Sequence, residues 1–206
     1  MSDTFPSTMS FVKSIFSLDL NVSIPEQGWS EQIRVQLAVH PEETETHVVS
    51  RTLALAHSAP LRPHFSQGLF EPKEPTFSSF NEIGNETLWG EVGIPTVKKL
   101  RKARSIHPVP QLRVYFYETP QIDQFCHLLR GSKENWIAPF TFFLLDPALI
   151  DRICEKEWDN TKRWDIVFLE DRIYLEINGS SDEGSLLSLD MWSEFQRSLR
   201  AAQMPA

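Results

Sequence analysis

The sequence predicts an α/β protein built on a mixed β-sheet that is flanked by helices. Three observations support this class. Apolar and polar residues alternate in two early segments, apolar residues then recur at helical spacing, and strand-like segments afterwards alternate with helix-like segments until a final strand pair. Strands separated by helices tend to pair in parallel, whereas the strand pairs near both ends of the chain form antiparallel hairpins, so we expect a mixed sheet.

The first elements are a hairpin and a helix. Residues 11–22 and 33–39 both show a period of two, and Pro25 and Gly28 lie in the turn between them, which predicts two antiparallel strands. Residues 40–57 then begin with a proline and acidic residues, and their apolar positions recur at helical spacing. An acidic first turn followed by an apolar stripe predicts a helix.

The middle of the chain predicts a long excursion and then alternating strands and helices. Residues 58–85 are rich in Pro, Ser, Phe and Gly without a clear period, and a loop of this length is more often functional than idle. The segments that follow are a strand at 86–93, a helix at 96–105, a strand at 112–117, a helix at 121–129, a strand at 140–145 and a helix at 147–156. A terminal hairpin pairs residues 165–169 with residues 173–177.

The chain is expected to form a single domain over residues 11–192. A chain of 206 residues with 41% apolar content can bury a core of its own. Residues 1–10 are polar and lack periodicity, which predicts a flexible N-terminal extension. Residues 193–206 lack turn signals, which predicts a C-terminal tail.

Composition and charge narrow the classes of function. No apolar run reaches the ~18 residues that a membrane-spanning helix needs, and the N-terminus lacks a signal-peptide pattern, so we expect a cytoplasmic protein without a membrane partner. The two cysteines, Cys126 and Cys154, lie far apart and predict buried free thiols rather than a disulfide framework or a zinc site. A formal net charge of −8 opposes non-specific attraction to polyanions, so any nucleic-acid site must be a local basic patch.

Such a basic patch follows the strand predicted at 86–93. Glu91 lies near the end of this strand, and Thr96 suits the N-cap of the next helix. The spacing of residues divides that helix into two faces. The inward face carries Val97, Leu100 and Ala103, and the opposite face carries Lys98, Arg101, Lys102 and Ser105. An acidic strand end is therefore expected to face the start of a basic helix.

Two of these charge patterns also have plain structural interpretations. Glu43, His47 and Arg51 lie four residues apart and share one face of the first helix, where a solvated face with weak ion pairs is the simplest interpretation. The basic residues of helix 96–105 are equally consistent with a solvated surface, because runs of like charge usually face water. Neither pattern alone identifies a function.

Three segments, taken in order, resemble the hallmark segments of the YaeQ family. They read HPEETETHVVSRTLALAH, GLFEPKEP and LWGEVGIPTVKKLRKA, and the likeness covers nearly the whole chain beyond the first ten residues. The resemblance implies a fold similar to the PD-(D/E)xK nuclease superfamily, that is, a restriction-endonuclease-like fold. Such a fold has a mixed sheet flanked by helices, with metal-binding acids on a strand pair.

The family pattern, carried over position by position, marks one group of residues in this chain: His40, Pro41, Glu43, Thr44, Arg51, Glu74, Pro75, Trp89, Glu91, Gly93, Pro95 and Lys102. One departure matters for chemistry. The superfamily's lysine lies two residues after the acid on the same strand, and here that position is Gly93. A lysine from the following helix could replace it, because a lysine side chain is long and flexible. Lys102 is the first candidate for this role, and Lys98 is the substitute.

Two functional hypotheses follow. In the first, the protein is a metal-dependent phosphodiesterase (nuclease) in which Glu74 and Glu91 bind Mg²⁺ or Mn²⁺, and Lys102 or Lys98 offsets charge that grows on the phosphate. Contacts to the substrate, a nucleic acid or nucleotide phosphate, would come from Glu43, Arg51 and Arg101. In the second, the protein is a catalytically inactive nucleic-acid-binding or regulatory protein on the same nuclease-like fold.

Overall fold

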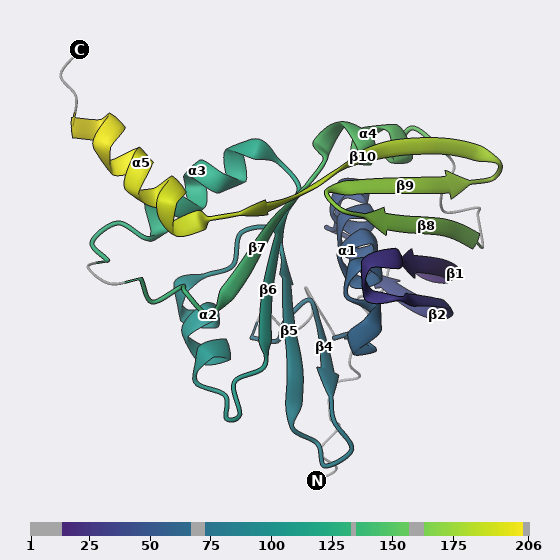
Figure 1. The fold of residues 1–206 in the computed structure, drawn as a ribbon, viewed down its shortest axis with the longest axis horizontal. Coiled ribbons are helices and arrows are strands. Elements are labelled where there is room, and N and C mark those ends of the chain that lie inside the picture. The colour runs from purple at the N-terminus through teal and green to yellow at the C-terminus, as the bar shows by residue number, and fades with distance from the viewer. Residues whose placement is uncertain (1–13, 67–72, 133–134, 157–162, 204–206) are drawn as a thin grey trace, which may run out of the picture.

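The computed structural model of the protein describes residues 14–66, 73–132, 135–156 and 163–203. The strands of these residues form one ten-stranded mixed sheet in the order β2-β1-β8-β9-β10-β7-β6-β5-β4-β3, with helices packed on it (Figure 1). The predicted class, α/β with a mixed sheet flanked by helices, is therefore confirmed. The N-terminal extension expected at residues 1–10 lies outside the described residues.

One half of the sheet contains both predicted hairpins. β1 (Ser14–Ile24) and β2 (Trp29–Val39) are antiparallel and are joined by the short 3-10 helix η1 (Pro25–Gln27). β1 also pairs in parallel with β8 (Arg163–Leu169), which forms an antiparallel hairpin with β9 (Arg172–Ile177). Alternate side chains are buried along the second part of β1, as its period of two predicts.

The other half of the sheet holds the parallel strands. Its strands are β3 (His64–Phe65), β4 (Phe77–Phe80), β5 (Glu86–Val92), β6 (Gln111–Phe116) and β7 (Phe140–Leu145). β5, β6 and β7 run parallel and are connected through α2 (Val97–Arg104) and α3 (Thr119–Leu128), whereas β4 pairs antiparallel with β3 and β5. The excursion predicted at 58–85 therefore contains two strands and the short helix η2 (Ala59–Leu61), while its residues 67–72 lie outside the described residues.

Strand β10 (Ser180–Leu189) joins the two halves of the sheet. Its residues up to Ser185 pair with β9, and its residues from Leu186 onward pair with β7, so it crosses from one half-sheet to the other (Figure 1). Helix α5 (Met191–Gln203) follows, and its Phe195 is buried. The C-terminal tail expected at residues 193–206 is thus helical as far as Gln203, and residues 204–206 lie outside the described residues.

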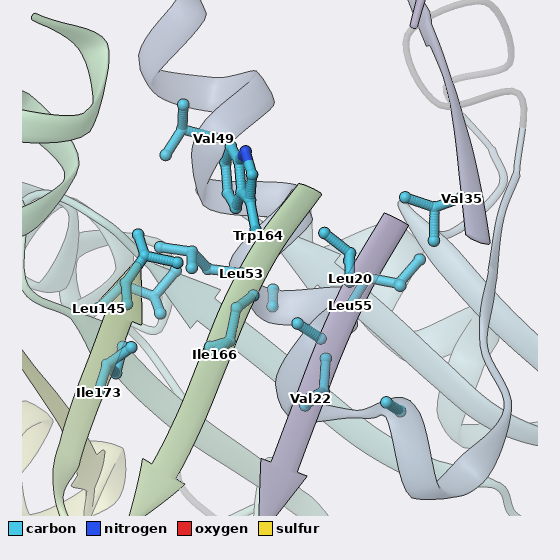
Figure 2. Close-up of a cluster of buried hydrophobic side chains, with 14 of the residues drawn as sticks. Leu20, Val22, Val35, Val49, Leu53, Leu55, Leu145, Trp164, Ile166 and Ile173 are labelled. Carbon is cyan, nitrogen blue, oxygen red and sulfur yellow. The ribbon is translucent and has the colours of Figure 1, made fainter. Parts of the chain in front are cut away.

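Helix α1 (Glu45–His57) lies inside the fold rather than on its surface. Every residue from Val48 to Ala56 is buried, and Figure 2 shows Val49 and Leu53 among side chains of the neighbouring strands. The simplest sequence interpretation gave this helix one solvated face, and that interpretation is wrong. The sheet curves around α1, and helix α4 (Pro147–Cys154) packs against it, so its other faces are covered as well (Figure 1).

The second half of the sheet separates two apolar clusters. One cluster contains α1 and α4 together with Leu88 of β5, and the other lies under α2, α3 and α5 and contains Trp89. Side chains of a strand alternate between its two faces, so neighbouring residues of β5 point to different clusters. This alternation determines which helix can contact Glu91, because Glu91 follows Trp89 by two residues and shares its face.

The described residues also bear on two features that the sequence does not predict, a membrane-spanning helix and a disulfide. None of the helices in the described ranges is long and apolar enough to cross a membrane. Both cysteines are free, with Cys126 buried, as predicted, and Cys154 half-buried. The fold is therefore held by packing and hydrogen bonds without a covalent cross-link between these two residues.

Candidate functional site

The buried carboxylate of Glu91 is the centre of the candidate site. Glu91 lies on β5 and is only 3% exposed. The indole Nε1 of Trp89 donates a hydrogen bond to Glu91 Oε1 at 2.6 Å, and Lys99 Nζ lies 2.8 Å from Glu91 Oε2. Both carboxylate oxygens are therefore engaged by groups of the protein itself.

Helix α2 brings Lys99 to this carboxylate. Thr96 is the N-cap of the helix, as predicted, and its hydroxyl accepts a hydrogen bond from the Lys99 backbone N–H at 3.2 Å. Lys99 lies one turn before Ala103, which is fully buried, so the Lys99 stem runs along the flank of the buried face. Its side chain is 18% exposed. Sequence reasoning missed Lys99: its spacing from Ala103 places it beside the buried face of α2 but does not show that this flank turns toward β5.

The two lysines predicted for this role lie elsewhere. Lys98 is exposed on the outer side of α2. Lys102 Nζ donates to the Lys73 carbonyl oxygen at 3.1 Å and lies 5.3 Å from the centre of the Trp89 ring. The cation that pairs with Glu91 is therefore Lys99, while Lys102 packs on the tryptophan that holds the same carboxylate.

The environment of Glu91 raises the pKa of its carboxyl group. Burial raises the pKa of the Glu91 carboxyl, and the charge of Lys99 together with the hydrogen bonds from Lys99 and Trp89 offsets that effect only in part. A carboxyl with a raised pKa can exchange a proton closer to neutral pH than an exposed glutamate can. The net effect of burial and of these two partners is therefore a raised pKa for the Glu91 carboxyl.

Glu74, the second predicted metal ligand, lies on a segment that runs beside β5. The Thr76 backbone N–H donates to the Gly90 carbonyl at 2.8 Å, and Val92 N–H donates to the Thr76 hydroxyl at 3.1 Å. Glu74 itself is half-buried. The structure thus places the chain next to Glu74 beside the strand that carries Glu91.

The arrangement of these carboxylates does not fit a divalent metal. Mg²⁺ takes carboxylate oxygens as ligands, yet both oxygens of Glu91 are engaged and an ammonium group lies 2.8 Å from one of them. Across the ranges that the structure describes, no group of three or more His, Cys, Asp or Glu side chains is placed to hold a metal ion. A metal bound by Glu74 and Glu91 would have to displace Lys99 and Trp89 first.

A second buried carboxylate, Glu43, lies on the α1 side of the sheet. Arg51 donates from Nε to Glu43 Oε1 at 2.6 Å and from Nη2 to Oε2 at 3.1 Å, and His47 Nδ1 lies 2.6 Å from Oε1. Arg51 also donates to the Ala38 carbonyl of β2 at 2.9 Å and lies over the Phe65 ring of β3. This cluster therefore ties the start of α1 to two strands.

The Glu43 cluster differs from the substrate contact that the sequence predicts. Burial alone would raise the pKa of Glu43, but hydrogen bonds and charge from His47 and Arg51 outweigh it and lower the pKa. The side chains of Glu43 and Arg51 are 4% and 7% exposed. They lie on the α1 side of the sheet, whereas Glu91 faces α2, so the structure does not bring the two groups together.

Four of the five basic side chains of α2 are exposed: Lys98, Arg101, Lys102 and Arg104. We call Lys98, Arg101 and Arg104 the basic face of α2, since they lie three residues apart and are all exposed. Within the described part of the chain, no ion pair includes any of the three. Arg101, predicted as a substrate contact, is thus placed where a large anion can reach it.

The fold and this site define a mixed α/β protein in which an acidic strand end is paired with a basic helix. The chain belongs to the YaeQ family. The family model described as YaeQ protein matches residues 9–184, a range that contains both buried carboxylates and all of α2. The family resemblance seen in the sequence is thereby confirmed.

Curated relatives match part of the chain. The uncharacterized proteins YaeQ of Escherichia coli (strain K12) and of Shigella flexneri are each 30% identical to this chain over 95 residues, which is 46% of this chain and 52% of theirs. The chain therefore spans about half the length of the curated relatives it matches. The names of these relatives assign no activity.

Crystal structures of YaeQ proteins share the fold. The YaeQ protein from Xanthomonas axonopodis pv. citri matches with a TM-score of 0.72 at 20% identity, covering 84% of this chain and 96% of that chain. The YaeQ protein from Pseudomonas syringae matches with a TM-score of 0.71 at 18% identity, covering 85% and 95%. At these identities the likeness shows a common fold.

Proposed function

We propose that the protein binds nucleic acid through phosphate contacts from the basic face of α2, and that Glu91 positions Lys99 rather than a metal. The observation that carries this proposal is the pairing of Glu91. Its carboxylate is occupied by Lys99 and Trp89, whereas the basic face of the same helix is exposed. Exposed lysine and arginine side chains bind phosphates by charge and hydrogen bonds, without reading sequence.

Electrostatics favours a contact confined to this helix. The eight residues of α2 include five basic and no acidic side chains, so its positive field is not cancelled within the helix. The chain as a whole has a formal net charge of −8, which repels a polyanion from most other surfaces. Binding is therefore expected to be local and to weaken as salt rises.

The proposal includes a PD-(D/E)xK type of scaffold. Helix α1 precedes the antiparallel pair β4 and β5, an acid lies near the end of β5, and α2 leads from β5 to the parallel strand β6. This order supports a nuclease-like fold in which Gly93 stands where the strand lysine is expected. The acid on β5 is then held by a lysine from the next helix.

Fluorescence anisotropy with labelled single-stranded and duplex DNA and RNA over a salt series tests the binding. We expect Lys98→Ala to weaken binding and to reduce the slope of log K against log salt by about 1. Arg34→Ala is the matched control, because Arg34 is an exposed arginine of β2 in the other half of the sheet. No binding at low salt, or equal weakening by both variants, contradicts the proposal.

A metal-dependent phosphodiesterase is the second candidate function, and it requires that a metal displace Lys99 and Trp89 from Glu91. The observation in its favour is the ammonium of Lys99 beside Glu91, because phosphoryl transfer needs a cation near the reacting phosphate. The test is cleavage of labelled DNA and RNA with Mn²⁺ or Mg²⁺ by wild type, Glu91→Gln, Lys99→Met and Lys102→Ala. Cleavage that is lost in Glu91→Gln and Lys99→Met but kept in Lys102→Ala supports this function. No cleavage by wild type, or cleavage retained in Glu91→Gln, excludes it.

A further inference from the structure

A cavity of about 470 Å³ lies between α2 and the chain that follows α3. Three arginines line it, Arg101 and Arg104 from α2 and Arg130 just after α3, and Ser132 and Trp136 are among its other lining residues. We call it the arginine-tryptophan pocket. Its volume falls within the roughly 300–1,000 Å³ that small-ligand sites occupy.

The charge of this pocket suits an anion. Arg104 Nη1 donates to the Trp136 carbonyl at 3.1 Å, and Arg130 Nη2 lies 3.4 Å from His127 Nε2. Of the ion pairs formed by the described residues, none includes Arg101, Arg104 or Arg130. Three guanidinium groups around one cavity repel one another, and a phosphate both relieves that repulsion and accepts paired hydrogen bonds.

The aromatic side of the pocket favours a ligand that also has a flat ring. Trp136 Nε1 donates to Ser132 Oγ at 3.1 Å, which restrains the indole, and the Arg101 guanidinium lies 5.7 Å from the ring centre. Leu128, which is 45% exposed, adds apolar surface at the rim. Nucleobases stack on indole rings and on guanidinium planes, so the pocket offers both groups that a nucleotide uses.

We propose that the arginine-tryptophan pocket binds one nucleotide of a single-stranded nucleic acid. The phosphate is bound by Arg104 and Arg130, and the base lies against Trp136 and Arg101. The inference rests on the proposed function and specifies that the nucleic acid is single-stranded. A base in a duplex is paired and stacked, so it is not available to a side pocket. The basic face of α2 then leads the strand into the pocket, since Arg101 and Arg104 belong to both.

The experiment compares two labelled oligonucleotides of equal length and phosphate number, single-stranded oligo-dT and an abasic oligodeoxynucleotide. Both carry the phosphates, but only the first can stack. We expect the wild-type chain to bind oligo-dT about tenfold more tightly than the abasic strand, and more tightly than a duplex of the same length. Fluorescence anisotropy at one fixed salt concentration gives both affinities.

Variants test separately whether Trp136 stacks on the base and whether Arg130 binds the phosphate. Trp136→Leu should remove most of the preference for oligo-dT over the abasic strand, whereas Trp136→Phe should keep most of it because the phenyl ring still stacks. Arg130→Ala should weaken binding of both strands to a similar extent, since it removes a phosphate contact. Arg34→Ala is the control for the lost charge, and circular dichroism checks that each variant is folded.

The outcomes separate this inference from the proposed function. If neither strand binds at low salt, the proposed function fails and the inference fails with it. If both strands bind equally and Trp136→Leu changes neither affinity, the nucleic-acid contact stands but the pocket is not a nucleotide site. Duplex binding tighter than oligo-dT binding also overturns the inference. If Trp136→Leu does not fold, the comparison of the two strands on wild type still decides.

Discussion

Glu43 and Glu91 are both buried glutamates, with side chains 4% and 3% exposed, yet their pKa values shift in opposite directions. Burial is the largest influence on each and raises the pKa of both. Around Glu43 it is outweighed by Arg51 and His47, and around Glu91 it is not outweighed by Lys99 and Trp89.

The partners of the two carboxylates explain the difference. Glu43 receives two hydrogen bonds from one guanidinium, a contact from an imidazole and a hydrogen bond from the His40 backbone N–H at 3.3 Å. Glu91 has two partners, the ammonium group of Lys99 and the neutral indole of Trp89. The number and charge of donors, rather than depth alone, therefore decide whether a buried carboxyl stays ionised. The partners of Glu43 therefore favour its ionised form, whereas the environment of Glu91 favours its protonated form relative to an exposed glutamate.

The largest expected effect comes from removing the guanidinium beside Glu43. Arg51→Met should lower the free energy of unfolding by about 3–5 kcal/mol, because it leaves a buried carboxylate without its main partner. Urea unfolding at neutral pH measures this. Arg34→Met, which removes an exposed arginine from its pair with Asp19, should change stability very little. If Arg51→Met lowered the free energy of unfolding as little as Arg34→Met is expected to, the buried contact between Arg51 and Glu43 would contribute no more than an exposed ion pair.

Two neighbouring lysines of α2 give the next comparison. Lys99→Met should lower the free energy of unfolding by about 2 kcal/mol, which is less than the loss expected for Arg51→Met. Lys99 is partly exposed, and Glu91 without its lysine can take up a proton. Lys98→Met should change the free energy of unfolding by no more than about 0.5 kcal/mol, because Lys98 is exposed and forms no ion pair with the residues that the structure describes. The measurement is again urea unfolding. A larger loss for Lys98→Met would reassign the lysine that pairs with Glu91.

The pH dependence of stability is the smallest and most specific effect. Glu43 has a pKa below its ordinary 4.5, so its stabilisation is present above that pH and is lost as the pH falls through the folded-state value. Glu91 has a raised pKa, so its contribution is present below pH 4.5 and is lost as the pH rises through the folded-state value. His57, whose pKa is lowered to about 3 chiefly by burial, affects wild type and variants alike and cancels from differences.

Glu43→Gln and Glu91→Gln make this opposition measurable. The stability of wild type relative to Glu43→Gln should increase as the pH rises to about 4.5 and then level off, because the pKa of Glu43 is lowered. Its stability relative to Glu91→Gln should decrease as the pH rises above about 4.5, because the pKa of Glu91 is raised. Each change amounts to about 1.4 kcal/mol per unit of pKa difference. Urea unfolding at several pH values gives both curves. Parallel curves for the two variants would mean that the two carboxyls titrate in the same way.

Much of the fold could be predicted because its signals are local. Both hairpins and the β5-α2-β6 unit follow from period, turn residues and the Thr96 cap. Strand β10 was missed because its first half is polar and its pairing joins distant segments. Helix α5 did carry a signal in the sequence, because the apolar residues Met191 and Phe195 are four residues apart and Asp190, a good capping residue, comes just before them. In the structure Asp190 accepts a hydrogen bond from the Ser193 N–H at 3.0 Å.

The candidate site was predictable only in part. Its acid, Glu91, and the basic helix after it could be read from the strand end and the cap that follows. The sequence could not show which lysine of α2 pairs with Glu91. Periodicity identifies the buried face of this helix but not which flank of that face turns toward β5. The burial of Glu43 and Arg51 depends on how β2 and β3, which flank α1 in the sequence, fold back over the helix, and helical periodicity alone could not distinguish this from a solvated stripe.

The shared strand β10 has a consequence for how the molecule unfolds. Its first half completes one half-sheet and its second half completes the other, so neither set of strands keeps its full ladder if β10 detaches. Two apolar clusters that could have melted separately are therefore coupled through one backbone. We expect amides of β9 and β7, which border β10 on either side, to lose protection from hydrogen exchange together, as one cooperative unit.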